Sequence, residues 1–117
     1  MNTVIDRYKN KFWYKNNEFH REDGPAIERT NGTKEWFKHN KRHREGGPAI
    51  EYINGVKFWY KHDLCHREDG PAYEGLNGYK AYWLEGIRYS EEEYWEKIKQ
   101  LKKCKLFKLK DDKIGWI

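Results

Sequence analysis

The sequence predicts a mainly β fold: an antiparallel meander of repeated β-hairpins in a single-layer sheet, capped by a C-terminal α-helix and a short terminal hairpin. Three observations lead to this prediction. A seven-residue motif recurs three times at one interval, an aromatic run precedes each copy, and an Asn-Gly pair follows each copy. Repetition at a fixed short period is typical of units that form one supersecondary piece each and bury their apolar residues against their neighbours.

The motif sets the register of the repeats. His-Arg-Glu-Asp-Gly-Pro-Ala occupies residues 20–26 and 66–72, His-Arg-Glu-Gly-Gly-Pro-Ala occupies residues 43–49, and consecutive copies start 23 residues apart. We therefore expect a single domain over residues 1–117. It should consist of a repeat array at 5–88 and a cap of helix plus hairpin at 90–117. The array divides into an N-terminal half-unit at 5–10, three units at 11–33, 34–56 and 57–79, and a degenerate unit at 80–88.

Each unit contains two runs that favour β-strands. The first is aromatic, Lys-Phe-Trp-Tyr-Lys at 11–15, and the second is Ala-Ile-Glu-Arg-Thr at 26–30. Asn31-Gly32, with counterparts at 54–55 and 77–78, then leads into the next aromatic run. Asn-Gly between two strands indicates a type I′ turn, because both central residues of that turn need a positive φ. The sheet should therefore grow by one hairpin per unit.

Side chains alternate between the two faces of a strand, so both faces of this sheet should be aromatic. Equivalent aromatic residues of successive units would line up in columns across the strands. Two interpretations of these columns remain open: they are the packing core of a sheet that has no second layer, or they are a surface on which bases or planar ligands stack. One face is predicted to carry Trp13, Trp36, Trp59 and Tyr82, and the other Phe12, Tyr14, Phe37, Phe58, Tyr60 and Trp83.

The composition changes after the array. Ser90 and Glu93 have the spacing of a capping box, which predicts that a helix begins here. Tyr94, Ile98 and Leu101 would lie on one face of this helix and cover the last hairpin, whose edge is otherwise free to pair with other chains. Beyond the helix we expect a closing hairpin, with strands at 105–109 and 113–117 and a turn at 110–112.

The net charge of +5 is concentrated at the C-terminal end, where residues 97–113 contain eight lysines and two aspartates. This end is either a solvated helix face or a contact for an anion or nucleic acid. No run approaches the roughly 20 apolar residues that span a bilayer, and the first residues lack a signal-peptide pattern. We therefore expect a soluble cytoplasmic protein with no membrane partner.

The two cysteines, Cys65 and Cys104, are consistent with a reducing compartment. Cys65 occupies the repeat position that Phe19 and Arg42 hold in the earlier units, so it has no repeated role.

The repeated motif and the aromatic run supply the candidate site residues. Stacked units would align the motif histidines and arginines in columns, where Arg bonded to a carboxylate and His bonded to a turn carbonyl would be structural. Alternatively, successive Arg and His side chains would bind the phosphates or carboxylates of an anionic ligand. The candidates are His20, Arg21, His43, Arg44, His66, Arg67, Trp13, Trp36 and Trp59.

Metal binding and catalysis find little support. His39 and His43, or His62, Cys65 and His66, are ligand types at short spacing, but the first unit has no equivalent of His39 and no second cysteine pair completes a tetrahedral set. Three equivalent copies of one motif, with no isolated nucleophile, weigh against an enzyme. We expect no cofactor, no metal and no catalytic residue.

The 23-residue period, the aromatic run, the Asn-Gly turns and the motif resemble MORN repeats of the divergent MORN-variant type, and similar units occur in phage and large-virus proteins. The resemblance covers residues 5–88. It implies a meandering sheet that serves as a non-catalytic binding platform, and a viral origin would imply a small accessory protein that sequesters or inhibits a host factor in the host cytoplasm.

Together these observations predict a non-enzymatic protein that binds an anionic ligand, either nucleotide-like or nucleic acid. The alternative is a scaffold that binds a host protein through the aromatic sheet face or the sheet edge, and free edges would also let two copies pair into a homo-oligomer.

Overall fold

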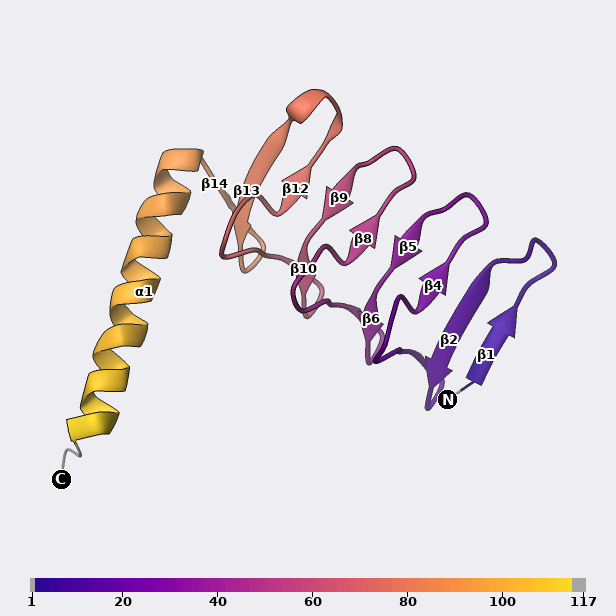
Figure 1. The fold of residues 1–117 in the computed structure, drawn as a ribbon, viewed down its shortest axis with the longest axis horizontal. Coiled ribbons are helices and arrows are strands. Elements are labelled where there is room, and N and C mark those ends of the chain that lie inside the picture. The colour runs from indigo at the N-terminus through magenta and orange to yellow at the C-terminus, as the bar shows by residue number, and fades with distance from the viewer. Residues whose placement is uncertain (1, 115–117) are drawn as a thin grey trace.

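The computed structural model describes the backbone of residues 2–114 and the side chains of residues 2–105. The molecule is a flat ladder with extents of 59 × 41 × 18 Å (Figure 1). Strands lie side by side from the N-terminus to the helix, and their long turns point to one side of the ladder while their short turns point to the other. The smallest extent leaves room for a single layer of strands with its side chains, as the sequence predicts.

All strand pairs are antiparallel, and the main sheet follows the order β1-β2-β4-β5-β8-β9-β12-β13-β14, with β3 also paired to β2. The pairs β6-β7 and β10-β11 form two further small sheets. The predicted meander is therefore confirmed. The strands are β1 (Asn2–Ile5), β2 (Lys11–Lys15), β3 (Glu18–Phe19), β4 (Ile27–Glu28), β5 (Lys34–Glu35), β6 (Phe37–Lys38), β7 (Lys41–Arg42), β8 (Ile50–Glu51), β9 (Lys57–Phe58), β10 (Tyr60–Lys61), β11 (Leu64–Cys65), β12 (Tyr73–Glu74), β13 (Lys80–Leu84) and β14 (Ile87–Tyr89).

The predicted pair of positive φ angles is present at the third Asn-Gly pair, with 58° at Asn77 and 77° at Gly78, whereas the other turns of this kind lie elsewhere. Asn16 and Asn17, between β2 and β3, both have positive φ, and the same holds at residues 39–40, 62–63 and 85–86. At the first two Asn-Gly pairs only the glycine does, with φ of 96° at Gly32 and 91° at Gly55. The prediction was wrong there because the asparagine acts through its side chain instead: the Asn31 Oδ1 accepts the Thr33 N–H at 2.9 Å.

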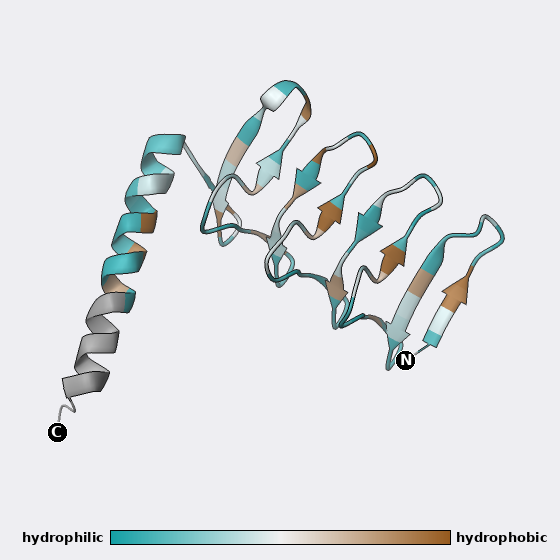
Figure 2. Ribbon diagram, in the orientation of Figure 1, coloured by the Kyte–Doolittle hydropathy of each residue, from teal (hydrophilic) through white to brown (hydrophobic). Residues whose placement is uncertain are grey.

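The alternation of faces follows the prediction. The three tryptophans of the array face the motif arginines, and the Phe and Tyr side chains pack together on the other face. In the first unit, Phe19 contacts Tyr14 and Phe37, with ring centroids 4.9 and 5.2 Å apart. Apolar positions recur in β1, β4 and β8 along the ladder (Figure 2), and Ala26, Ala49 and Ala72 are fully buried.

Helix α1 (Glu91–Ile114) begins where the sequence predicts. The Glu93 N–H donates to the Ser90 Oγ and the Ser90 N–H donates to the Glu93 carboxylate, both at 3.2 Å, which is the predicted capping box. Tyr94 and Ile98 are buried against Tyr82 and Leu84 of β13, so the helix covers the last hairpin. Leu101 is 39% exposed, because the helix axis leads away from the sheet after its first turns.

The closing hairpin was predicted wrongly for residues 105–114, which continue the helix to Ile114. The sequence from Ile87 to Ile114 contains no Gly or Pro, and its leucines and lysines are good helix formers. The remaining part of that prediction, residues 115–117, lies outside the described residues. Within the described chain, no helix is both long enough and apolar enough to span a bilayer.

Candidate functional site

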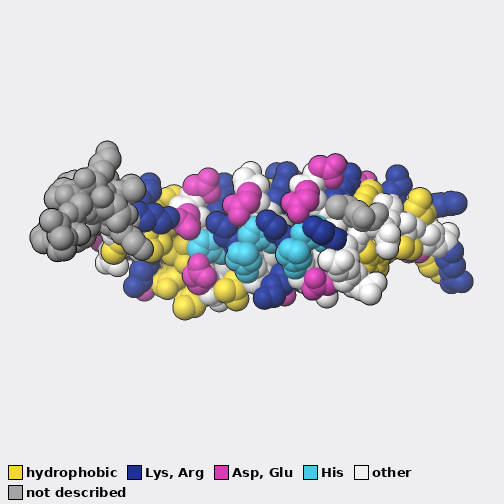
Figure 3. Space-filling view, turned by 90° about the horizontal axis from the view of Figure 1, so that it is seen from below, with side chains coloured by type: hydrophobic (Ala, Val, Ile, Leu, Met, Phe, Trp, Pro, Cys, Tyr) yellow, Lys and Arg dark blue, Asp and Glu magenta, His cyan; other side chains and the backbone are white. Residues whose placement is uncertain are grey.

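Histidine side chains lie in a row along the short-turn edge of the ladder, between charged side chains (Figure 3). His20, His43 and His66 are all buried. Each Nδ1 accepts a backbone N–H from the type I′ turn of the next unit: from His39 at 3.0 Å, from His62 at 3.1 Å and from Glu85 at 2.9 Å. The expected partner was a turn carbonyl, whereas the structure has a turn N–H.

The other ring nitrogen of each histidine bonds to the glutamate of its own motif. The distance from Nε2 to the carboxylate is 2.6 Å for Glu22, 2.9 Å for Glu45 and 3.1 Å for Glu68. Because Nδ1 accepts a backbone N–H, the ring carries its proton on Nε2 and donates it to the carboxylate. Both nitrogens are thus occupied inside the protein.

These bonds also act on the carboxylates. The hydrogen bond from His20 lowers the pKa of Glu22 below its usual value, and the bond from His43 does the same for Glu45. The pKa of Glu68 is lowered first by Lys105 and then by His66. All three glutamates are therefore held in their charged form.

The motif arginines are stacked on the tryptophans of their own units. The Cζ atom lies 3.9 Å from the ring centre for Arg21 on Trp13, 3.8 Å for Arg44 on Trp36 and 4.0 Å for Arg67 on Trp59. Such contacts contribute about 0.5–2 kcal/mol each.

The motif glycine is required on the other side of each guanidinium. A Cβ at Gly47 would lie 2.9 Å from the Arg44 Cζ, and Gly24 and Gly70 are equally close to their arginines. In every motif Nη1 donates to the carbonyl of the motif proline, at 3.0–3.1 Å, and to a glutamate on the following strand. Tryptophan, glycine and the proline carbonyl thus hold each guanidinium in place.

The structure therefore brings the nine candidate residues together as three Trp-Arg-His sets, one per motif. Their contacts are mostly internal, which supports the structural interpretation of the columns. Among the side chains of residues 2–105, no group of three or more His, Cys, Asp and Glu residues could hold a metal ion. His39 and His62 instead lie against His20 and His43, with ring centres 4.5 Å apart in both pairs.

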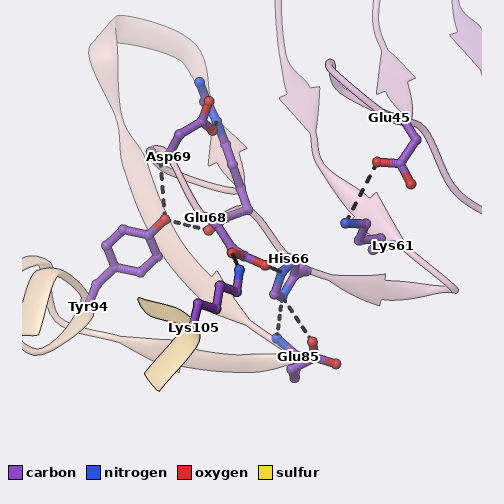
Figure 4. Close-up of polar contacts among 10 residues, drawn as sticks. Glu45, Lys61, His66, Glu68, Asp69, Glu85, Tyr94 and Lys105 are labelled. Atoms are coloured by element: carbon purple, nitrogen blue, oxygen red, sulfur yellow. Dashed lines mark hydrogen bonds and ion pairs between the residues drawn. The ribbon is translucent and has the colours of Figure 1, made fainter. Parts of the chain in front are cut away.

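Helix α1 closes the array by contacting the third motif (Figure 4). The Tyr94 hydroxyl donates to the Arg67 carbonyl and accepts the Gly70 N–H, and the Lys105 Nζ lies 2.9 Å from the Glu68 carboxylate. The helix thus packs on the last copy of the motif, at the place where a further unit would otherwise follow.

An aromatic groove of about 620 Å³ opens on the opposite face, over the third and fourth units. Sequence reasoning missed it. Its lining includes the ring side chains Phe58, Tyr60, Tyr73, Tyr79 and Trp83, together with Asp63, Leu64, Cys65, Ala81, Gly86 and Arg88.

Two small residues account for the position of the aromatic groove. Cys65 occupies the same repeat position as Phe19 and Arg42. In the first unit the Phe19 ring packs against Phe37, and in the second unit Arg42 lies over the Phe37 and Tyr60 rings. Ala81 stands at the strand position of Phe12 and Phe58. The departure of Cys65 from the repeat was the signal in the sequence that could have located the groove.

The Cys65 thiol is a wall of this groove rather than a reactive group. Burial raises its pKa to about 11, so the thiol stays protonated near neutral pH.

In comparisons with models of protein families, with curated proteins and with solved structures, nothing matched this chain. The resemblance to MORN-variant repeats therefore stays a prediction, as do the viral origin, the cytoplasmic location and the pairing of sheet edges between copies.

Proposed function

We propose that this chain is a non-enzymatic binding protein that holds an apolar segment of a protein partner in the aromatic groove. The observation that carries the proposal is that small side chains replace large ones at one place on the Phe and Tyr face of the array. Position 65 holds a cysteine and position 81 an alanine, so rings that form the core in the first unit line an open groove in the third and fourth. Concave surfaces rich in aromatic side chains are typical of binding sites.

The groove favours the protein-scaffold alternative over the anionic ligand. In the first and third motifs each arginine already bonds to an aspartate, a glutamate and a backbone carbonyl. The motif histidines use both ring nitrogens internally. A long nucleic acid or nucleotide along these columns would have to replace those bonds, whereas the groove is open as it stands.

A displayed peptide library selected on the wild-type protein tests the proposal, with each selected peptide then measured against Cys65→Phe. That variant places in the groove the side chain that the first unit carries at the same position. We expect peptides with aromatic or aliphatic anchors that lose at least about tenfold in affinity on Cys65→Phe, which corresponds to about 1.4 kcal/mol.

Cys104→Ser is the matched control, since Cys104 is exposed on the helix and does not line the aromatic groove. It should bind like the wild type. Peptides that bind Cys65→Phe equally well would contradict the proposal. So would binders that are acidic and are lost when salt is raised, because apolar contacts in a groove are little affected by ionic strength.

A further inference from the structure

A second groove lies on the tryptophan and arginine face, between the second and third motifs, and has a volume of about 550 Å³. Trp59 is in its lining, one wall is formed by the second motif, and Lys105 of the helix reaches it from the far end. Figure 4 shows two ion pairs among its lining residues, Lys61 with Glu45 and Lys105 with Glu68. We call it the inter-motif groove.

The arginine of the second motif lacks a bond that its two counterparts make. The Arg21 Nε donates to the Asp23 carboxylate at 3.0 Å, and the Arg67 Nε donates to Asp69 at 2.8 Å. Gly46 stands at this position in the second motif. The hydrogen bonds of the Arg44 side chain to the described residues all go through Nη1 and none through Nε, and this side chain is 30% exposed, against 20% for Arg21 and 21% for Arg67.

Arg44 nevertheless keeps the other contacts that its counterparts make. Its guanidinium stacks on Trp36, packs against Gly47 and donates through Nη1 to the Pro48 carbonyl at 3.0 Å. A ligand therefore need not order this side chain on binding, which removes an entropic cost. The space beside Gly46 is open too, since a Cβ there would meet no atom within 4 Å.

The charges around the inter-motif groove favour a ligand group that carries a single negative charge. Its lining contains four cationic side chains (Arg44, Lys61, Arg67 and Lys105) and three acidic ones (Glu45, Glu68 and Asp69). The equivalent groove between the first and second motifs has three of each. The three acids nearby would repel a phosphate dianion more strongly than a carboxylate.

We propose that the inter-motif groove is a carboxylate-binding site, in which an Asp or Glu side chain of a partner polypeptide accepts the Arg44 Nε–H and takes the place of the missing aspartate. The protein itself shows the chemistry twice, in the bonds of Asp23 and Asp69 to their arginines. The linings of the inter-motif groove and the aromatic groove share Tyr60 but otherwise differ, and either groove could bind without the other.

Nitrogen-15 spectra of the arginine Nε–H groups test this directly, with a short blocked peptide containing Asp-Glu as the probe at low salt. We expect a saturable shift of the Arg44 signal, while the Arg21 signal stays in place as the internal control, because Arg21 is already bonded to Asp23 and does not line this groove. Arg44→Lys, which keeps the charge but loses the Nε donor, should weaken binding about tenfold.

Asp23→Gly is the complementary variant, because it gives the first motif the sequence of the second. It should make the Arg21 signal respond to the peptide as Arg44 does, and it keeps the proposal testable if Arg44→Lys is poorly folded. Equal shifts of all three signals, an unchanged Arg44 signal, or a stronger response to inorganic phosphate than to the peptide would overturn the proposal.

Discussion

The first and third units of the array have the same backbone arrangement but use their Phe and Tyr face differently. In the first unit Phe19 closes the face, stacking on Tyr14 and contacting Phe37. In the third unit Cys65 leaves the corresponding space open, and rings of the same kind line the aromatic groove. One repeat position thus decides whether a unit's aromatic face is core or surface, while the motif arginines on the opposite face make the same stacking contact in both.

Exchanging the side chains of residues 19 and 65 should remove this difference between the units, and it should have the largest effect on stability of the changes considered. Phe19→Cys removes a ring from the packed first unit, and we expect it to lower the free energy of unfolding by about 2–4 kcal/mol. Urea unfolding in reducing buffer would measure the loss. The reciprocal Cys65→Phe should change the free energy by less than about 1 kcal/mol, since it fills an open groove. Equal losses in the two variants would mean that position 19 is no better packed than position 65.

The histidine column predicts the next largest effect. His43→Leu keeps an apolar side chain of similar size but leaves the His62 N–H without its acceptor, which should cost about 1–3 kcal/mol. His43→Asn supplies an oxygen in place of Nδ1 and should recover part of the loss. Hydrogen exchange at the His62 amide would localise the effect, and a loss that is the same for both variants would argue against this bond as the cause.

The helix cap predicts a smaller effect confined to the C-terminal end. Tyr94→Phe removes the hydroxyl that bonds to the Arg67 carbonyl and the Gly70 N–H, at a cost of about 1 kcal/mol. The Gly70 amide should exchange faster while amides of the first motif are unaffected. Tyr8→Phe at an exposed tyrosine is the control and should leave Gly70 unchanged. Faster exchange throughout the array would show that the cap acts on every unit rather than on the third motif.

The smallest of these effects on stability is expected when the pH is lowered. Glu22 and Glu45 have lowered pKa values in the folded state, so the unfolded chain binds more protons as the pH falls below about 4.5. Their contribution to stability is present above that pH and is lost as the pH falls through the folded values. A Glu22→Gln, Glu45→Gln double variant should therefore lose less stability between pH 5 and about 3 than the wild type. Parallel curves for the two proteins would contradict the assignment.

The sequence carried the features that depend on local chemistry. The capping box at Ser90 and Glu93, the alternating faces and the antiparallel order all follow from short-range patterns, and all are present. The terminal hairpin was predicted wrongly over residues 105–114, because these residues lack a helix breaker and helix propensity prevailed over the alternating pattern.

The bonding of the candidate site could be predicted less well. Residue spacing placed His and Arg in columns, but it could not show that Nδ1 accepts an N–H from the next unit, since that contact joins residues 19 positions apart in sequence. The stacking of each arginine between a tryptophan and a glycine likewise depends on how the motif loop folds back over the strand. The empty space at Cys65 became visible only once its neighbours were in place.

The bond from each motif histidine to the next unit gives the array a direction, because a unit is complete only when another turn follows it. An in-frame duplication or deletion of one unit would leave every such contact satisfied, with Glu85 still following the last histidine and α1 still docked on the last motif. The length of this protein can therefore change in evolution, or by engineering, in whole units without any compensating change at either end.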